Sequence, residues 1–335
     1  MQTRILTLEE IEQLAMRALV AAGTTAENAR PLAIATAATE ADGVASHGLA
    51  YTPIYCEHVQ CGKVDGRAAP VVTQPRPGVV CVDAATGFAH PAIDAGFERL
   101  VPTARENGIA ALAITNSYNC GVLGYHTYRL AQEGLLGIGF TNAPASIAPS
   151  GGKKPVVGTN PFSIAAPNDD GEPAVLIDQS ASTIAKSEVM KHARENKPIP
   201  EGWALDVDGN PTTDAEAGLK GSMAPSGGYK GVGIALMTEL LAAAMTGATL
   251  GIDASPFSGT AGGPPKTGQF FIAIDPGATS GGAFADRLSA LVQAIRAQDG
   301  AHLPGDGRKS KRLAARADGV AVNVATLERI DAFLG

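Results

Sequence analysis

A serine–histidine pair, Ser46-His47, lies in the stretch ADGVASHGLAYTPIYCEH, just ahead of a segment with a helical pattern. A free histidine titrates near pKa ~6.5, so its imidazole can donate a proton at neutral pH. Glycines on both sides, Gly43 and Gly48, would let a substrate approach the backbone closely. Two interpretations stay open: His47 is a general acid aimed into a cleft, or it is a surface residue beside a serine that caps a helix at residues 53–59.

Other catalytic signatures are weak or absent. Adjacent side chains are expected to point in different directions, so His47 is a poor base for Ser46, and no G-x-S-x-G elbow occurs. The G-x-G pairs at residues 137–139 and 231–233 lack the third glycine of a G-x-G-x-x-G turn, and no G-x-x-x-x-G-K-[ST] motif is present. The sequence therefore disfavours a serine hydrolase, a P-loop enzyme and a Rossmann dinucleotide fold.

A metal site is the next alternative, because Cys56, His58 and Cys61 stand close together in CEHVQC. A zinc site of this kind needs a second pair of ligands, and the other two cysteines, Cys81 and Cys120, do not supply one at suitable spacing. Cysteines within a helix are more often small core residues. We therefore expect no metal.

Three loops have the composition of anion-binding sites. The turn Thr159-Asn160-Pro161 follows a glycine, and its amides and hydroxyl could bind an anion. GGYKG at residues 227–231 places a lysine and free amides at a helix N-terminus. PGDGRKSKR at residues 304–312 holds four cations, for which a solvated basic loop is the alternative. Three such loops in a chain of net charge −7 favour a small polyanionic ligand.

The secondary-structure pattern interleaves strands and helices, which is typical of the α/β class. The first helix, at residues 7–22, begins with a capping pattern of Thr7 and Glu10. A helix at residues 228–246 is expected to be largely buried because it is apolar. The other expected helices lie at residues 26–39, 91–107, 128–133 and 281–298. The expected strands lie at residues 79–83, 109–115, 137–142, 162–167, 174–179 and 269–275.

The composition bounds the class of protein. With 45% hydrophobic and 18% charged residues, 335 residues are enough for one or two globular domains. The acidic balance disfavours a nucleic-acid partner. No signal-peptide pattern occurs, and no apolar run approaches the roughly 20 residues of a membrane span, so no membrane partner is expected. Four cysteines make no disulfide scaffold, and we expect a cytoplasmic protein.

Nine motifs, in order along nearly the whole chain, resemble one family, the non-Rossmann malate/L-lactate dehydrogenase type of NAD(P)-dependent oxidoreductases. They are ADGVASHG, VDAATGFAHPA, ITNSYNCGVLGY, KPVVGTNPFSIAAP, IDQSAS, GGYKG, ELLAAAMTG, TGQFFIAIDPG and LPGDGRK. The resemblance implies an α/β fold with a non-Rossmann cofactor-binding sheet domain at residues 106–284. It also implies a helical companion domain for substrate and dimerisation, built from residues 1–105 and 285–335, and a homodimer.

The resemblance also implies roles for individual residues. His47 would be the proton donor and Ser46 part of a relay, completed by Glu188 where the family usually has aspartate. The substrate would lie near Tyr51, Thr159, Lys186 and Ser187. The implied cofactor contacts are Tyr118, Asn119, Cys120, Gly121, Val122, Asp178, Gln179, Ser180, Tyr229, Lys230, Gly305, Arg308, Lys309 and Lys311.

One departure from the family pattern bears on the substrate. The family commonly has SHG-x-x-R, whose arginine would hold a substrate carboxylate, but SHGLAY places Tyr51 at that position. A phenol cannot make the bidentate charged contact of an arginine, which favours a monocarboxylate with an apolar ring over a dicarboxylate. The carboxylate could still be held by backbone amides, Thr159 or Lys186.

We therefore expect a reductase of cyclic imines, nearest to the Δ1-pyrroline-2-carboxylate and Δ1-piperideine-2-carboxylate reductases. Hydride would be transferred to C2, and L-proline or L-pipecolate would form. A 2-hydroxy acid dehydrogenase for malate, lactate or sulfolactate is the alternative, and a protein without catalysis or a lyase is a third class. Arg308, Lys309 and Lys311 could pair with a 2′-phosphate, which favours NADPH, with NADH as the alternative.

Overall fold

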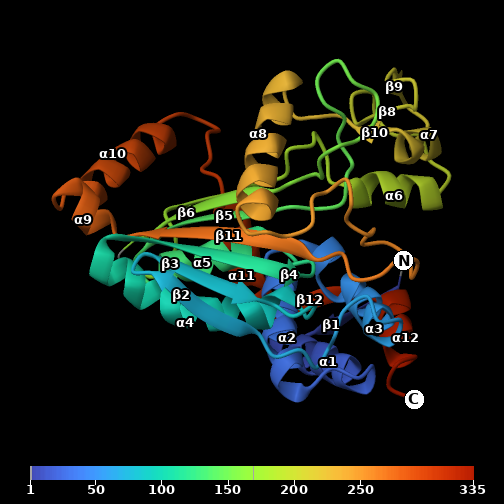
Figure 1. The fold of residues 1–335 in the computed structure, drawn as a ribbon, viewed down its shortest axis with the longest axis horizontal. Helices are drawn as coiled ribbons and strands as arrows, with labels where there is room; N and C mark the ends of the chain where they lie inside the picture. Colours follow the sequence, from blue (N-terminus) through green and yellow to red (C-terminus); the bar gives the residue numbers. More distant parts are fainter. Residues whose placement is uncertain (1, 169) are drawn as a thin grey trace.

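A seven-stranded sheet forms the centre of the protein (Figure 1). The computed structural model describes residues 2–168 and 170–335. Every neighbouring pair of strands is antiparallel except β3–β4, so the sheet is not of the parallel Rossmann type. The α/β class with a non-Rossmann sheet is confirmed. In spatial order the strands are β2 (Val71–Arg76), β3 (Val79–Asp83), β4 (Ile109–Ser117), β11 (Thr267–Ile274), β5 (Leu136–Thr141), β6 (Phe162–Ala166) and β7 (Val175–Gln179).

Helices cover both faces of this sheet. On one face, α4 (Ala89–Asn107) and α5 (Leu123–Gln132) pack on β3 to β6, where Leu100 and Leu112 are fully buried. On the other face lies α8 (Tyr229–Glu239), which continues into the π-helical turn η3 (Leu240–Ala244). Alternating strand residues supply apolar side chains to both layers, as expected for a sheet covered on two sides.

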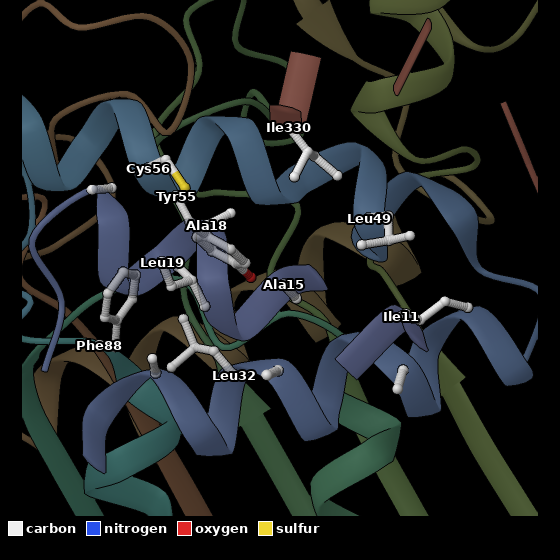
Figure 2. Packing of buried hydrophobic residues seen from close by; sticks show 14 of the residues in the cluster. Ile11, Ala15, Ala18, Leu19, Leu32, Leu49, Tyr55, Cys56, Phe88 and Ile330 are labelled. Carbon is white, nitrogen blue, oxygen red and sulfur yellow. The ribbon is translucent and has the colours of Figure 1, made fainter. Parts of the chain in front are cut away.

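The chain ends form a helical layer with its own core (Figure 2). α1 (Leu8–Ala21) begins with the predicted capping box of Thr7 and Glu10 and packs on α2 (Ala26–Ala41), α3 (Thr52–Gln60) and α12 (Val324–Asp331). β1 (Thr3–Leu6) pairs with β12 (Val320–Asn323), which ties the two ends together. Fully burying an aliphatic side chain such as Ile11 or Leu32 contributes about 1.5–3 kcal/mol.

A small lobe follows β7 on the α8 side of the sheet (Figure 1). It contains a short three-stranded sheet and two helices, and Val189, Ile199 and Met223 are among its buried residues. Its elements are α6 (Lys186–Arg194), β8 (Ala204–Leu205), β9 (Pro211–Thr212), α7 (Ala215–Lys220) and β10 (Ser222–Met223). The chain then passes through α8 and β11 to α9 (Pro276–Ser280), α10 (Phe284–Arg296) and α11 (Asp306–Asp318).

The helix at residues 228–246 is not largely buried, so that prediction is wrong. Leu240 is 61% exposed and Met245 is 63% exposed, whereas Val232 and Ala235 face the protein. α10 has no buried residue at all. Both helices therefore present apolar side chains on the surface of the single chain.

Residues 71–107 belong to the sheet layer, since they form β2, β3 and α4. The sheet layer thus begins earlier than residue 106, and the division into two domains stays a prediction. Among the helices of the described chain, none is long and apolar enough to cross a membrane.

Candidate active site

His47 lies in a tight turn between two helices. The turn consists of the 3₁₀ segments η1 (Ala45–His47) and η2 (Leu49–Tyr51), which follow α2 and lead into α3. Ser46 Oγ lies 3.0 Å from His47 Nδ1, so the expectation that these neighbouring side chains diverge is wrong for this turn. This contact leaves Nε2 as the ring nitrogen available to a substrate. No side-chain hydrogen bond caps α3, so Ser46 is not the cap of that helix.

A buried carboxylate shapes the same turn from the preceding helix. Glu40 Oε1 accepts a hydrogen bond of 2.7 Å from the backbone N–H of Leu49. Burial raises the pKa of Glu40. A Cβ added at Gly48 would lie 2.2 Å from that oxygen, so Gly48 makes room for Glu40 and not for a substrate. Gly43 similarly packs against the side chain of Lys311.

Asp178, near the end of β7, is the carboxylate whose charge acts on His47. Burial lowers the pKa of His47, and the charge of Asp178 raises it in part. Arg308 Nη2 donates to Asp178 Oδ2 at 2.8 Å, and Arg308 Nη1 lies 3.9 Å from Asp42 Oδ2. The side chains of Asp42 and Asp178 are only 6% and 10% exposed, so solvent screens this cluster weakly. His47, Asp178 and Arg308 are therefore electrostatically linked.

The expected relay residue, Glu188, lies in the first turn of α6. The described part of the chain shows no interaction between Glu188 and His47, whereas Asp178 does act on the imidazole. The relay role of Glu188 stays a prediction. Sequence reasoning assigned Asp178 only to the cofactor and did not find Asp42 or Glu40. Glu40 and Asp42 lie at the C-terminal end of α2, where negative charges interact unfavourably with the helix dipole. This unfavourable placement is the sequence signal that could have identified them.

Tyr51 stacks on His47 in the position where the family commonly has arginine. The two rings are parallel, with centroids 6.1 Å apart. The Tyr51 hydroxyl lies 3.5 Å from the carbonyl oxygen of Phe257, and its ring meets Tyr55 edge-on. Burial raises the pKa of Tyr51 to about 12, so the phenol is neutral at physiological pH. The wall beside His47 is therefore aromatic and uncharged.

The other predicted substrate residues lie on separate segments. Lys186 Nζ donates to Ser146 Oγ at 3.3 Å, and burial lowers the pKa of Lys186. Ser187 Oγ is buried and has no hydrogen-bond partner within residues 2–168 and 170–335. The carbonyl of Thr159 accepts from the N–H of Ala181 at 2.8 Å. A buried hydroxyl without a partner fits a ligand that completes its hydrogen bonding.

The loop before α5 is predicted to line the cofactor. In the structure some of its side chains are buried in the core, whereas its backbone remains a candidate for cofactor contacts. The ring of Tyr118 is 1% exposed and its hydroxyl bonds His58, so the Tyr118 side chain belongs to the core and only its backbone could meet a cofactor. Asn119 Oδ1 accepts from the N–H of Gly121 at 2.6 Å. Gly121 adopts a φ of 67°, a conformation that favours glycine. The carbonyl of Cys120 lies 2.9 Å from His126 Nε2, and Val122 is the N-cap of α5.

Two of the three loops with an anion-binding composition lie beside the segment that follows β7. The segment from Asp178 through Gln179 and Ser180 runs on to Ala181, whose N–H bonds Thr159 and whose carbonyl accepts from Ser226 at 2.8 Å. Ser226 immediately precedes the GGYKG segment, so the turn at residue 159 and the start of α8 flank one stretch. Asn160 is not available for a ligand, because its side chain bonds the buried carboxylate of Glu239 at 2.7 Å.

The N-terminus of α8 fits a cofactor phosphate. Its N-cap, Gly228, has a φ of 66° and no side chain that could satisfy the first amides of the helix. Tyr229 is 71% exposed, and Lys230 is exposed beside it. Free amides, the helix dipole and a lysine together favour an anion at this position.

The basic loop at the start of α11 is only partly free for a 2′-phosphate. Gly305, the N-cap, has a φ of 101° and packs on Leu176. Arg308 Nη2 is paired with Asp178, whereas Arg308 Nη1 is buried and has no hydrogen-bond partner among the described residues, so the phosphate role of Arg308 stays a prediction. Lys309 Nζ lies 3.8 Å from Asp170, and Lys311 is exposed, so these two lysines remain candidates.

The metal alternative finds no support. Cys56 lies in the core of the helical layer, and His58 bonds Tyr118 and the carbonyl of Gly259. No group of three potential metal ligands exists among the residues that the structure describes, and the four cysteines are free thiols.

The serine–histidine pair, the nearby charge of Asp178 and the mostly antiparallel sheet fit proton-transfer chemistry on a fold that is not of the Rossmann type. Residues 6–331 match the family model described as Malate/L-lactate dehydrogenase, and the chain belongs to this family. It is 44% identical over 312 residues to a (2R)-3-sulfolactate dehydrogenase (NADP(+)) of Chromohalobacter salexigens, covering 92% of each chain. It is 40% identical over 309 residues to a Delta(1)-pyrroline-2-carboxylate/Delta(1)-piperideine-2-carboxylate reductase of Pseudomonas putida, covering 92% of this chain and 90% of that one.

Solved structures show the same fold. The delta1-piperideine-2-carboxylate reductase of Pseudomonas syringae pv. tomato superposes with a TM-score of 0.93 at 36% identity, covering 99% of this chain and all of that one. The sulfolactate dehydrogenase of Methanocaldococcus jannaschii gives a TM-score of 0.88 at 26% identity, covering 98% of this chain and 96% of that one.

Proposed function

We propose that this protein is an NADPH-dependent reductase of cyclic 2-imino acids. It would convert Δ1-pyrroline-2-carboxylate to L-proline and Δ1-piperideine-2-carboxylate to L-pipecolate. The observation that carries the proposal is the neutral ring of Tyr51 stacked beside His47, because an apolar wall fits a saturated ring better than a second anion. The pyrroline- and piperideine-2-carboxylate reductases among the relatives support it.

The chain's own residues supply acid catalysis and placement. His47 donates a proton to the imine nitrogen as negative charge would build there, and Ser46 holds the ring through Nδ1. Asp178 favours the protonated imidazole before the transfer. The bound reduced nicotinamide supplies the hydride. Lys186, the Ser187 hydroxyl and Thr159 are the groups that would hold the carboxylate, and the relay role of Glu188 remains part of the proposal.

NADPH would be held by backbone amides more than by side chains. The start of α8, with Tyr229 and Lys230, is suited to the diphosphate or ribose, and Lys309 and Lys311 are suited to the 2′-phosphate. The name of the sulfolactate relative includes NADP(+), which agrees with this choice. NADH is the alternative cofactor.

A 2-hydroxy acid dehydrogenase is the second candidate function, because the sulfolactate dehydrogenase is 44% identical to this chain. A sulfonated or dicarboxylic substrate carries two anionic groups, and each would need a cationic partner when buried. Because Tyr51 stands where the family commonly has an arginine, the wall beside His47 lacks one such cationic partner. The two candidates therefore differ in how much positive charge the site must offer.

The test is a panel of candidate acids assayed with both cofactors by the absorbance of the reduced nicotinamide. We expect pyrroline- and piperideine-2-carboxylate with NADPH to give the highest kcat/KM, above sulfopyruvate, oxaloacetate and pyruvate. His47→Gln should lower kcat on the order of 10²–10⁴-fold and leave NADPH binding unchanged. A higher kcat/KM for sulfopyruvate would replace the imine reductase with the second candidate. No turnover with any acid would remove both.

We further propose a homodimer in which α10 and the exposed face of α8 are covered. A helix without a buried residue gains little from its own chain, yet the apolar residues of α10 recur at helical spacing along one face. Both helices project from the sheet in Figure 1. The residues of the apolar face of α10 are Phe284, Leu288, Leu291, Val292 and Ile295.

We place the protein in the cytoplasm. Its four cysteines are unpaired thiols, and two of them, Cys56 and Cys120, are buried. Free thiols are typical of a reducing compartment. A fractionation experiment with antibody detection of the native protein would check this.

A further inference from the structure

A cavity of about 320 Å³ lies where α1, α2, α5 and α11 converge, and it shares Asp42 with the charged cluster described above. The helices α1 and α2 lie on the α5 side of the sheet, away from α8 (Figure 1). Each helix contributes side chains three or four positions apart, which share one helix face. Six of the lining residues carry the chemistry: Glu9 and Glu12 from α1, Tyr125 and Tyr128 from α5, and Arg312 and Arg316 from α11.

Charges of both signs face this cavity without internal partners. Within the described residues, Glu9, Glu12 and Arg316 form no ion pair. The guanidinium of Arg312 is already committed, since it pairs with Asp42 and lies 4.0 Å over the Tyr128 ring. The remaining wall consists of three alanines of α2, the two tyrosines, Leu8, Gln132 and Asp42.

This combination matches a small molecule with an ammonium group, a carboxylate and a short saturated body. The ammonium would lie against the two glutamates, and the carboxylate would accept from Arg316. The carbon skeleton would lie on the alanines and the tyrosine rings. We propose that this cavity is a second binding site for a zwitterionic amino acid. We further propose that a bound amino acid changes the position of His47 and the charge around it.

The route to His47 runs through Asp42, which lines the cavity and ends α2. Asp42 is five positions before His47, so a shift of the α2 terminus moves the catalytic turn directly. Asp42 also pairs with Arg312 and lies 3.9 Å from Arg308, which holds Asp178. An occupant that displaces Asp42 or α11 therefore changes both the position of His47 and the charge around it.

L-Proline is the probe, a choice that rests on the proposed function because L-proline is its expected product. Binding is measured by calorimetry on the full chain, and inhibition is measured against pyrroline-2-carboxylate. We expect L-proline to inhibit with a noncompetitive component that weakens about tenfold or more in Glu12→Gln and in Arg316→Gln, since each loses one charged contact. Glu27→Gln and Arg30→Gln, exposed on α2, are the matched controls and should behave like the wild type.

Three results would overturn the proposal. Purely competitive inhibition, equal in all variants, would mean that L-proline binds only at the active site. Absence of calorimetric binding would mean that the cavity takes no such zwitterion. A raised KM for NADPH in Glu12→Gln or Arg316→Gln would make the cavity part of the cofactor site. If the protein reduces no imine, only the proposed function is overturned. The second site is then still tested, because calorimetry on the wild type and the variants shows whether L-proline binds in the cavity.

Discussion

His47 is under two opposing influences at the scale of the single residue. Burial lowers the pKa of the imidazole and so disfavours its acid form, and the negative charge of Asp178 counteracts this. Arg308 Nη2 lies 2.8 Å from Asp178 Oδ2, and its positive charge reduces the effect of Asp178 on the pKa of His47. The protonation of His47 thus depends first on burial and then on the charge of Asp178, which is itself paired with Arg308.

Asp178 and Arg308 should shift the pH profile in opposite directions. Reduction requires protonated His47, so activity falls as pH rises through its pKa. Asp178→Asn removes the charge that raises this pKa and should move the basic limb of kcat/KM to lower pH. At a fixed pH above the limb, kcat/KM should then fall about tenfold for each pH unit that the limb moves. Arg308→Gln leaves Asp178 unopposed and should move the limb to higher pH. Movement of the limb in the same direction in both variants would contradict this arrangement.

The residue types of the site could be predicted from the sequence, but their pairing could not. Ser46 and His47 stand out locally as an ionisable pair near two glycines, although the sequence left a surface histidine as the alternative. Arg308 and Asp178 lie 130 positions apart, and nothing in their local sequence indicates that one faces the other. Tyr118 shows a different limit: its motif indicates a cofactor contact, but its ring is buried against His58, so only its backbone could make that contact.

At the scale of elements, local signals predicted six of the seven strands of the central sheet, but they missed β2, β1, β12 and the short strands of the small lobe. They gave no information on the order of the strands. β3 matches its expected residues because a short apolar run is bounded by turn residues. β11 lies between β4 and β5 although it comes more than 100 residues later, and such pairing leaves no local mark. The apolar helix α8 was expected to be buried, because a sequence does not distinguish a core face from an exposed apolar face.

Gly48 joins the two 3₁₀ segments of the turn that holds His47. In Gly48→Ala the new Cβ would lie 2.2 Å from Glu40 Oε1, so Glu40 must move and its bond to Leu49 is lost. We expect a loss of about 1–3 kcal/mol in the free energy of unfolding, together with a lower kcat. Denaturant unfolding and steady-state assays measure both. Gly233→Ala, in open space on α8, is the control and should not destabilise the protein.

Two buried histidines under the loop at residues 118–122 should make stability pH-dependent. Burial lowers the pKa of His90 to about 3 and that of His126 well below its usual range. Both are therefore neutral when folded, and the unfolded chain binds more protons below pH ~6.5. Stability should fall as pH drops from about 6.5 towards 3, by up to ~1.4 kcal/mol per pH unit for each histidine.

The measurement is the free energy of unfolding by urea at a series of pH values. His90→Met should reduce the slope between pH 6.5 and 4.5, because one proton-binding group is removed from the unfolded chain. The same change at exposed His302 is the control. An unchanged slope in His90→Met would mean that His90 does not contribute to the acid sensitivity.

At the scale of the whole molecule, the exposed helices indicate that one chain is an incomplete unit. Leu291 of α10 is 58% exposed and Leu240 after α8 is 61% exposed, whereas Val232 and Ala235 on the other side of α8 are buried. Apolar surface of this kind is stabilised when a second surface covers it, at about 25 cal/mol per Å². The sequence marks these residues as apolar, but only the fold shows that the chain itself leaves them uncovered.

Leu291→Asp should therefore dissociate the proposed homodimer. A charge in the middle of a covered apolar face would be desolvated without a partner, which costs far more than it would in an exposed monomer. Sedimentation velocity over a range of concentrations should show a shift from about 68 kDa towards the 34.0 kDa of the single chain. Ala290→Asp introduces the same charge on the other side of α10, where it stays in water, and should leave the mass unchanged. Equal masses for the wild type and Leu291→Asp would show that α10 does not hold two chains together.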